Sequence, residues 1–478
     1  MRVAVTEPSS PPTQAIRRRP IDLAWGSLVV LVPMVVALLS RMGTTDLTYH
    51  IRAGDEILRA HALPRVDTYT FSVAGQPWLD QQWGAQVVLA LGHRGGWATL
   101  AFLQAIFIGV SFFLIYLACR ASGASVRTSS LLTVVGFLVA SPTLAMRPQL
   151  VALPLFAAAM WALASRETAP RRLYLIPVLA GVCANVHGSF TIFPLIVGLA
   201  WIQDASRHVP GSRRLLSLTL ATAAATLLNP FGVDAWRYAY DLSTNPIIRK
   251  TISEWAPVTA TDVSGLFMIG SALAVVAVLA RRGTATRWTT LLWLGVFFML
   301  AMSAQRAIVW WAMVTPVILA ELFPAPAIAP EHPGREPKAP AVGVIAAMLV
   351  AVVVLLPWWR PNDLLSQAPP GVTQAVLADV PVGARMFVHQ PWGSWFEYAT
   401  HDRTVFVDSR IEIIPKDIWD DYGQVGFAGA DWKAVLARWH PDAIVAADDW
   451  KLLKDLEAPG SGWRSVYKDD DGEVFLPA

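Results

Sequence analysis

The chain has 478 residues, of which 54% are hydrophobic and 15% charged, and its formal net charge is +3. Its mean hydropathy of +0.45 excludes an ordinary soluble globular protein, so most of the chain must face lipid or other apolar helices. The small net charge is spread among loops, which excludes the concentrated basic surface of a nucleic-acid-binding protein. Cys119 and Cys183 lie in apolar runs and indicate neither a disulfide nor a metal cluster.

The N-terminal segment predicts a tail followed by a membrane span. Residues 1–20 are rich in Pro, Ser and Thr and cannot form a core, so we predict a disordered tail. The apolar run over 21–40 is long enough to cross a bilayer, and no small-residue cleavage site follows it, which favours a span over a signal peptide. Further apolar runs bring the predicted number of spans to about eleven. These runs lie at residues 97–119, 128–145, 148–165, 172–187, 189–203, 215–230, 263–280, 288–304, 307–324 and 341–357.

Arginine and lysine residues near the span ends predict the orientation of the chain. They gather on alternate connections, and the positive-inside rule assigns these connections to the cytoplasm. The N-terminus is then cytoplasmic, and the Pro-rich stretch over 324–340 is a flexible cytoplasmic linker. The first outer loop (42–96), the loop over 233–262 and everything after Pro357 lie outside. We therefore expect a mainly α-helical, multi-pass protein of the cell inner membrane, with its transmembrane domain over 21–357.

The segment 358–478 has the composition of a soluble domain. Its β-rich runs alternate with helical patterns, as in a small extracytoplasmic α/β domain. The Asp471–Gly472 pair lies between two strand-like runs and predicts a final hairpin. The predicted strands lie at 385–389, 404–407, 443–446, 463–468 and 473–476, and the predicted helices at 372–380 and 432–439.

The short outer turns between the spans carry unusual polar clusters. An ionisable group at membrane depth is costly and usually faces a protein-lined or watery cavity, so several on one face suggest one cavity. Arginine offers forked donors that match phosphate oxygens, although a long side chain at a helix end can simply reach the interface. The Asn229–Pro230 pair more simply ends a helix. The remaining cluster residues are Arg147, Gln149, Asn185, His187, Gln305 and Arg306.

Two parts of the first outer loop hold candidate acid or base residues. Asp46 and His50 lie four residues apart at a predicted helix start, so both would share one helix face. A helix cap is the alternative role for Asp46. Asp80 lies between Trp78 and Trp83, where either a site role or an interfacial anchor is compatible with the pattern. No dense cage of carboxylates suggests a metal, although Asp46 and Asp80 could share one divalent cation.

The order of these elements resembles the GT-C class of membrane glycosyltransferases. The shared features are a first span, a long outer loop with an early acidic residue, many further spans and an outer C-terminal domain. The aromatic stretch Pro391–Tyr398, which includes Trp392, is similar to the acceptor-recognition region of oligosaccharyltransferase catalytic subunits, as are Asp408 and Arg410 after it. Packing of the domain on the membrane helices is the alternative for Trp392.

The resemblance implies transfer of a sugar from a polyprenyl-phosphate donor to an acceptor in the cell envelope. In that reaction the donor phosphate meets Arg147, His187 and Arg306, which stabilise charge on the leaving group. Asp46, assisted by His50, removes the acceptor proton, and Asp80 is a further catalytic candidate. A single carboxylate acting as base favours inversion at the sugar carbon. The candidates for binding acceptor or substrate are Gln149, Asn185, Gln305, Trp392, Asp408 and Arg410, and no cofactor is expected.

Two other functions remain compatible with a polytopic membrane protein. A transporter or flippase of lipid-linked sugars would need polar groups at the midplane and on both sides, whereas the clusters here favour one side. A noncatalytic scaffold that presents the C-terminal domain would need none of the polar turn residues, so replacement of Arg147 and Arg306 by alanine would then be silent.

Overall fold

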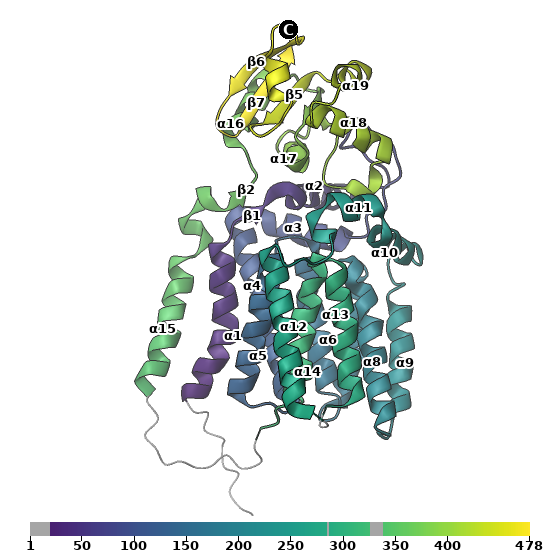
Figure 1. Cartoon of the computed structure of the whole chain (residues 1–478), viewed down its shortest axis with the longest axis vertical. Coiled ribbons are helices and arrows are strands. Elements are labelled where there is room, and N and C mark those ends of the chain that lie inside the picture. The colour runs from purple at the N-terminus through teal and green to yellow at the C-terminus, as the bar shows by residue number, and fades with distance from the viewer. Residues whose placement is uncertain (1–19, 284–285, 326–337) are drawn as a thin grey trace, which may run out of the picture.

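The computed structural model describes residues 20–283, 286–325 and 338–478. The predicted N-terminal tail, apart from Pro20, and most of the predicted Pro-rich linker therefore lie outside the described residues. Figure 1 shows a bundle of long helices with smaller helices across its upper end and an α/β domain above them. The bundle helices are α1 (Pro20–Leu39), α4 (Gly96–Ala121), α5 (Val126–Ala140), α6 (Pro148–Ala164), α7 (Leu175–Cys183), α8 (Ile192–Ser206), α9 (Ser212–Ala225), α12 (Val263–Arg282), α13 (Trp288–Ser303), α14 (Ile308–Ala320) and α15 (Lys338–Val354).

The apolar length of the helices identifies a membrane protein. Among the described residues, five helices are long and apolar enough to cross a bilayer, and four further apolar helices are shorter. The predicted number of about eleven spans is not confirmed by these lengths and stays a prediction. The five long ones are Ile21–Leu39, Gly96–Ala121, Val126–Thr143, Gly188–Ser206 and Val263–Arg282, and the shorter ones are Pro148–Ala164, Trp288–Ser303, Gln305–Ala320 and Val342–Val354.

Helix α14 forms the centre of the bundle. Every residue from Ile308 to Ala320 is buried, as expected for a helix that is apolar on all sides. Helix α5 packs closely against it at Gly136, where an added Cβ would come within 2.5 Å of the Ala312 carbonyl oxygen. Small residues permit this approach of two backbones in a membrane bundle. Because Arg306 lies two residues before the start of α14, the central position of this helix brings that arginine to the middle of the bundle end that faces the C-terminal domain.

Short helices cover the end of the bundle that faces the C-terminal domain (Figure 1). Helix α2 packs on α3 at Gly54, where a Cβ would lie 2.1 Å from the Gln86 carbonyl oxygen, so only glycine allows this contact. Helix α3 has 11 residues and is too short to span a bilayer. These covering elements are α2 (Thr44–Ala60), α3 (Trp83–His93), α10 (Asp234–Thr244), α11 (Pro246–Thr251) and the 3₁₀ turn η4 (Ser253–Trp255).

The C-terminal part of the chain folds around a five-stranded sheet of order β4-β3-β5-β7-β6. Strands β3, β4 and β5 are parallel, whereas β5, β7 and β6 are antiparallel neighbours, so the predicted final hairpin is confirmed. Every residue of the central strand β5 is buried, which indicates that both faces of the sheet are covered. The strands are β3 (Arg385–Val388), β4 (Thr404–Val405), β5 (Ala443–Ala447), β6 (Trp463–Lys468) and β7 (Gly472–Pro477), with helices α16 (Pro370–Asp379), α17 (Gln390–Ala399), α18 (Lys416–Gly426) and α19 (Trp432–Trp439).

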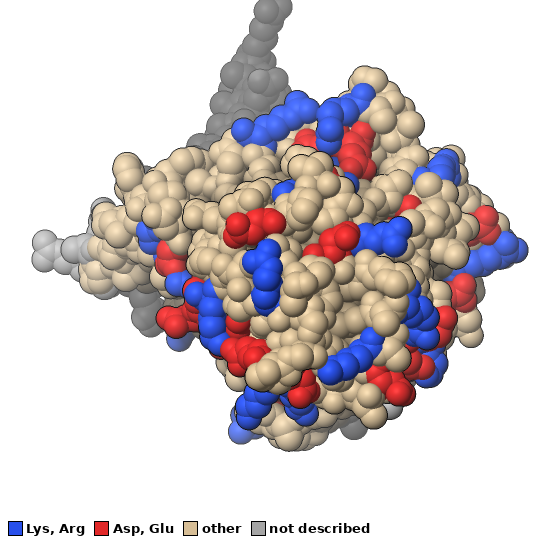
Figure 2. All heavy atoms as spheres, turned by 90° about the horizontal axis from the view of Figure 1, so that it is seen from above, with Lys and Arg blue, Asp and Glu red and all other residues tan. Residues whose placement is uncertain are grey.

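The C-terminal domain is joined to the first outer loop by backbone pairing. Strand β1 (Met42–Gly43), just before α2, pairs in parallel with β2 (Leu365–Ser366), and Thr70 forms a bridge with Val405. Seen from above, the outer face of the molecule carries interspersed basic and acidic side chains without a large patch of one sign (Figure 2). The pairing holds α2 between the bundle and the domain, which is where the site lies.

Candidate functional site

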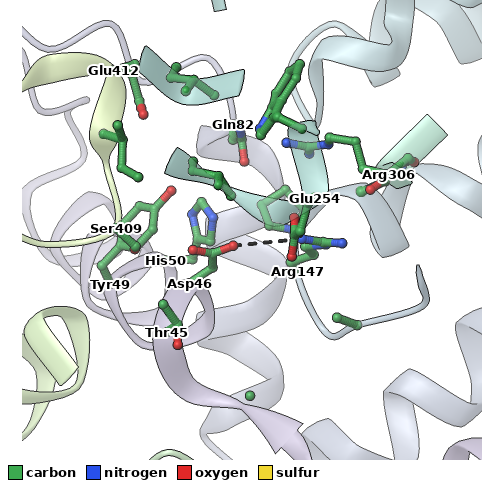
Figure 3. Close-up of a pocket in the computed structure, with 18 of the residues that line it drawn as sticks. Thr45, Asp46, Tyr49, His50, Gln82, Arg147, Glu254, Arg306, Ser409 and Glu412 are labelled. Carbon is green, nitrogen blue, oxygen red and sulfur yellow. Dashed lines mark hydrogen bonds and ion pairs between the residues drawn. The ribbon is translucent and has the colours of Figure 1, made fainter. Parts of the chain in front are cut away.

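A polar cavity of about 400 Å³ lies between the upper end of the bundle and the C-terminal domain (Figure 3). Segments that are far apart in the sequence contribute its walls: α2, the turns before α6 and α8, the loop over 233–262, the turn before α14 and the segment after β4. Its ionisable lining residues are Asp46, Tyr49, His50, Arg147, His187, Tyr238, Glu254, Arg306 and Glu412. The predicted residues Asp46, His50, Arg147, His187 and Arg306 are therefore brought together on one side of the bundle.

Asp46 and His50 face the cavity from consecutive turns of α2. The N-cap of this helix is Gly43, so Asp46 does not serve as the cap. His50 Nδ1 lies 3.3 Å from Gln86 Nε2, which also donates a 2.7 Å hydrogen bond to Asp80 Oδ1. Burial lowers the pKa of His50 to about 3, with further lowering by Arg410 and Arg147, so His50 is neutral at physiological pH.

Asp80 lies behind this wall and does not line the cavity. Its side chain is 3% exposed, and its Oδ2 has no hydrogen-bond partner. Burial raises its pKa to about 7, although the hydrogen bond from Gln86 opposes the rise. Asp80 does not face a substrate in the cavity. It acts on the site indirectly, through the contacts of Gln86 with Asp80 and His50.

Asp46 has the electrostatic setting of a proton acceptor. Its side chain is 40% exposed because it faces the cavity, yet protein surrounds it on the other sides. Burial raises its pKa, and the nearby Glu254 carboxylate raises it further, whereas Arg147 and Arg306 oppose the rise. A carboxylate with a raised pKa that faces a cavity suits general-base chemistry near neutral pH.

Glu254 is a cavity residue that the sequence analysis missed. It lies in η4 and forms an ion pair with Arg147, whose Nη1 is also 3.9 Å from Asp46 Oδ2. Burial alone would raise the pKa of Glu254, but Arg147 and Arg306 together lower it, so Glu254 is ionised. Its position beside Trp255 in an outer loop was the available signal, because the same pairing of an acid with tryptophan drew attention to Asp80.

The C-terminal domain supplies a second missed acid. Glu412 follows β4 and accepts a 3.0 Å hydrogen bond from the Tyr238 hydroxyl of α10. Burial raises the pKa of Glu412. Because the cavity wall includes residues of this segment and of α2, the site is complete only when the domain is docked.

Arg306 and His187 form the wall between the polar cavity and a second, mainly apolar cavity of about 500 Å³. Arg306 Nη2 lies 3.2 Å from His187 Nε2, and its guanidinium lies over the Trp255 ring at 4.5 Å. Gln149 lines both cavities and donates a 2.9 Å hydrogen bond to the Arg306 carbonyl oxygen. The apolar cavity extends along α8, α10, α13 and α14, past side chains that include Ile192, Trp236, Leu300 and Trp310.

Three other predicted residues lie outside both cavities. Asn185 accepts a 3.1 Å hydrogen bond from the Trp83 indole and donates to the Gly181 carbonyl oxygen. Gln305 donates to Asp262 at 3.1 Å and so braces the start of α12. Trp392 is buried within the C-terminal domain, where its ring contacts His389 and Phe396.

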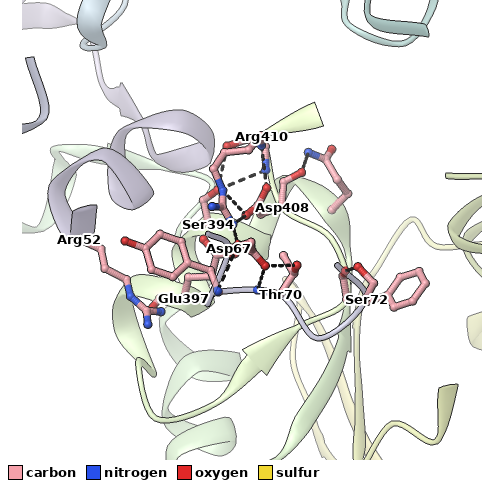
Figure 4. A network of polar contacts seen from close by, with 12 residues as sticks. Arg52, Asp67, Thr70, Ser72, Ser394, Glu397, Asp408 and Arg410 are labelled. Atoms are coloured by element: carbon pink, nitrogen blue, oxygen red, sulfur yellow. Dashed lines mark hydrogen bonds and ion pairs between the residues drawn. The ribbon is translucent and has the colours of Figure 1, made fainter. Parts of the chain in front are cut away.

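Asp408 and Arg410 belong to a sealed polar network above the cavity (Figure 4). The Arg410 side chain is 0% exposed and pairs with both Asp408 and Asp67 of the first outer loop. Its guanidinium lies 4.6 Å from the Tyr69 ring and 4.6 Å from the Trp78 ring. The carboxylates of Asp408, Glu397 and Asp67 raise the pKa of Arg410 against the opposing effect of burial. These residues join the C-terminal domain to the outer loop and do not face the cavity.

The comparisons with known proteins identify the fold. Searches against protein-family profiles and characterised sequences give no match. By structure, the chain is similar to the archaeal oligosaccharyltransferase AglB from Archaeoglobus fulgidus, in complex with an inhibitory peptide and a dolichol-phosphate, at a TM-score of 0.57 and 14% identity. The apo form of the Archaeoglobus fulgidus oligosaccharyltransferase gives a TM-score of 0.52 and 12% identity. Each alignment covers 88% of this chain and 69% of the other.

The chain therefore has the polytopic fold of the GT-C class membrane glycosyltransferases, in agreement with the resemblance noted in its sequence. At these identities the likeness establishes the fold, and the function must be argued from the site.

Proposed function

We propose that the chain is a glycosyltransferase that moves a sugar from a polyprenyl-phosphate-linked donor to an acceptor at the outer face of the cell inner membrane. The observation that carries this proposal is the wall formed by Arg306 and His187 between a polar and an apolar cavity. A lipid-linked donor has a lipid tail, a phosphate and a sugar in that order. The apolar cavity suits the tail, the Arg306 side of the wall suits the phosphate, and the polar cavity suits the sugar. The dolichol-phosphate in the AglB complex supports a lipid phosphate as the ligand of this fold.

In the proposed arrangement the lipid chain enters along the apolar cavity, and its phosphate contacts Arg306. A guanidinium donates two parallel hydrogen bonds to phosphate oxygens, and the Trp255 ring beneath it limits its motion. The sugar then projects into the polar cavity toward Asp46. Arg306 stabilises the negative charge that grows on the phosphate as the bond between it and the sugar carbon breaks.

The acceptor group attacks the sugar carbon from the opposite side. Its proton passes to Asp46, and the polyprenyl phosphate leaves with the electron pair of the broken bond. Neutral His50 lines the same cavity one helical turn from Asp46, and because its Nδ1 faces Gln86, we assign its proton to Nε2. Asp46 acts as a base and forms no covalent bond to the sugar, so the configuration at the sugar carbon is inverted. The cytoplasmic N-terminus and the extracytoplasmic domain are part of the same proposal.

A panel of radiolabelled polyprenyl-phosphate sugars, incubated with purified protein and cell-envelope extract, tests this function. We expect label from at least one donor to move to an envelope acceptor, with release of polyprenyl phosphate. Movement of intact donor across a vesicle membrane without cleavage would instead identify a flippase. Absence of both cleavage and movement with every donor would contradict the proposal.

A further inference from the structure

Three separate elements bring charged groups together around one arginine of the polar cavity. Asp46 comes from α2, Arg147 from the turn before α6, and Glu254 from η4. A single nitrogen, Arg147 Nη1, hydrogen-bonds Glu254 Oε2 and lies 3.9 Å from Asp46 Oδ2. Figure 3 shows the two acids reaching this arginine from different ribbons.

The surrounding structure holds the Arg147 side chain in this position. Its side chain is only 8% exposed, and Nη2 also contacts the Thr143 carbonyl oxygen at 3.4 Å. Its backbone is extended at the N-cap of α6, and Pro148 follows it in the first turn of that helix. The guanidinium is therefore held against the two carboxylates from behind.

Arg147 and Arg306 differ in how much of their charge is engaged. Arg147 contacts two carboxylates directly, whereas Arg306 acts on the same carboxylates from a greater distance and has direct side-chain contacts with His187 and Trp255 in the described part of the chain. A guanidinium that is already neutralised by carboxylates attracts a phosphate less strongly. The two arginines therefore have different tasks, and phosphate binding suits Arg306.

The position of Arg147 Nη1 is one that a divalent cation would otherwise occupy. Mg²⁺ and related ions bind carboxylates from separate loops and hold them at fixed distances. Here the Arg147 guanidinium lies between the carboxylates of Asp46 and Glu254 and performs that function. A divalent ion beside Arg147 would meet a fixed positive charge at contact distance.

We propose that Arg147 is the resident cation of this site, a positioning residue that pairs with both Asp46 and Glu254 and takes the place of a divalent metal between them. The catalytic consequence, transfer without added metal, rests on the proposed function. The binding consequence does not: the wild-type protein should have no site for Mn²⁺ at these carboxylates, and removal of the guanidinium should create one.

Mn²⁺ titration followed by electron paramagnetic resonance tests the binding consequence without any donor. We expect no saturable binding to the wild-type cavity and a gain of at least about tenfold in Mn²⁺ affinity in Arg147→Met, which leaves two unpaired carboxylates. Adding Asp46→Asn or Glu254→Gln to Arg147→Met should abolish that gain. Arg147→Lys keeps the charge and should resemble the wild type, and Arg237→Met, which removes an exposed arginine of α10, is the matched control.

Saturable Mn²⁺ binding to the wild-type protein that Asp46→Asn abolishes would overturn the inference, and this measurement needs no folded Arg147 variant. A folded Arg147→Met protein that binds no Mn²⁺ would also overturn it. Once transfer has been observed, loss of transfer in EDTA would reject the inference and leave the glycosyltransferase function standing. Failure of the whole donor panel would reject the function and leave the Mn²⁺ result unaffected.

Discussion

Two arginine–carboxylate clusters lie close to the same outer loop and differ in their access to solvent. Arg147 contacts Asp46 and Glu254 at the wall of a cavity, and the two acids are 40% and 38% exposed. Arg410 contacts Asp67 and Asp408 with every partner at 0% exposure. The residue types are the same, so the difference lies in whether the surrounding segments leave an opening.

This difference in solvent access distinguishes a cluster that can take part in a reaction from one that only stabilises the fold. A buried charge cluster cannot exchange protons with a substrate, and removal of its cation leaves uncompensated charges. A cluster at a cavity wall keeps part of its surface for a ligand, and its acids can gain and lose protons. We therefore expect substitutions at Asp46 to change turnover, and substitutions at Arg410 to change stability.

The largest expected effect is on turnover in Asp46→Asn. Without a proton acceptor, transfer should fall about 10²–10⁴-fold, the usual contribution of a general base, while the protein remains folded. The measurement is label transfer from the active donor, with melting temperature as the check on folding. Asp55→Asn, which changes another acid of α2 outside the cavity, should transfer normally.

The pH dependence of transfer by the wild-type protein tests the same role of Asp46. Because burial and Glu254 raise the pKa of Asp46, the base becomes protonated at a higher pH than a free aspartate does. Transfer should fall as the pH decreases through that raised value. Unchanged turnover in Asp46→Asn would remove this residue from the mechanism.

Arg410→Met should destabilise the protein by about 3–5 kcal/mol, because two buried carboxylates lose their shared partner. Thermal unfolding and protease sensitivity of the C-terminal domain would measure this effect. Arg438→Met removes a surface pair with Asp421 in the same domain and should cost less than about 1 kcal/mol. Equal stability of the two variants would show that the Arg410 network does not hold the domain in place.

Arg306→Gln should weaken the donor interaction by about 1.5–3 kcal/mol, since a charged hydrogen-bond donor to phosphate is lost. This corresponds to a fall in kcat/KM for the donor of roughly 10–100-fold. Steady-state transfer at varied donor concentration gives the value, with Arg237→Gln as the surface control. A normal kcat/KM would place the phosphate elsewhere in the cavity.

The smallest effect is expected for Asp80→Asn. Burial raises the pKa of Asp80 in the folded protein from 3.8 to about 7. Its favourable contribution to the free energy of folding is therefore complete below pH 3.8 and is lost as the pH rises to about 7. Asparagine has no such dependence. The melting temperature of the variant should exceed that of the wild type at neutral pH, because asparagine brings no charge into the buried site. The difference should vanish near pH 4.

Local sequence patterns were sufficient to predict part of the site. The spacing of Asp46 and His50 predicts a shared helix face, and charge bias predicts that the turns with Arg147, His187 and Arg306 lie on one side. These inferences use contacts within one helix or one rule of membrane insertion. The short helices α7 and α9 show the limit of that approach, because helix length does not establish how many segments span the membrane.

Glu254 and Glu412 could not be assigned in the same way. Their positions depend on how the loop over 233–262 and the segment after β4 pack against α2, which are contacts between distant parts of the chain. Asp67 shows the same limit, because its partner Arg410 is 343 residues away in the sequence. Polar composition marks such residues as candidates, but it does not say which of them face a cavity and which are sealed.

The pairing of β1 with β2 has a consequence for biogenesis. The register joins Met42 to Leu365, so the strand that precedes α2 can pair with its neighbour only after residue 365 has been synthesised. The chamber between the bundle and the C-terminal domain would therefore form late, after the helices of the bundle have been made.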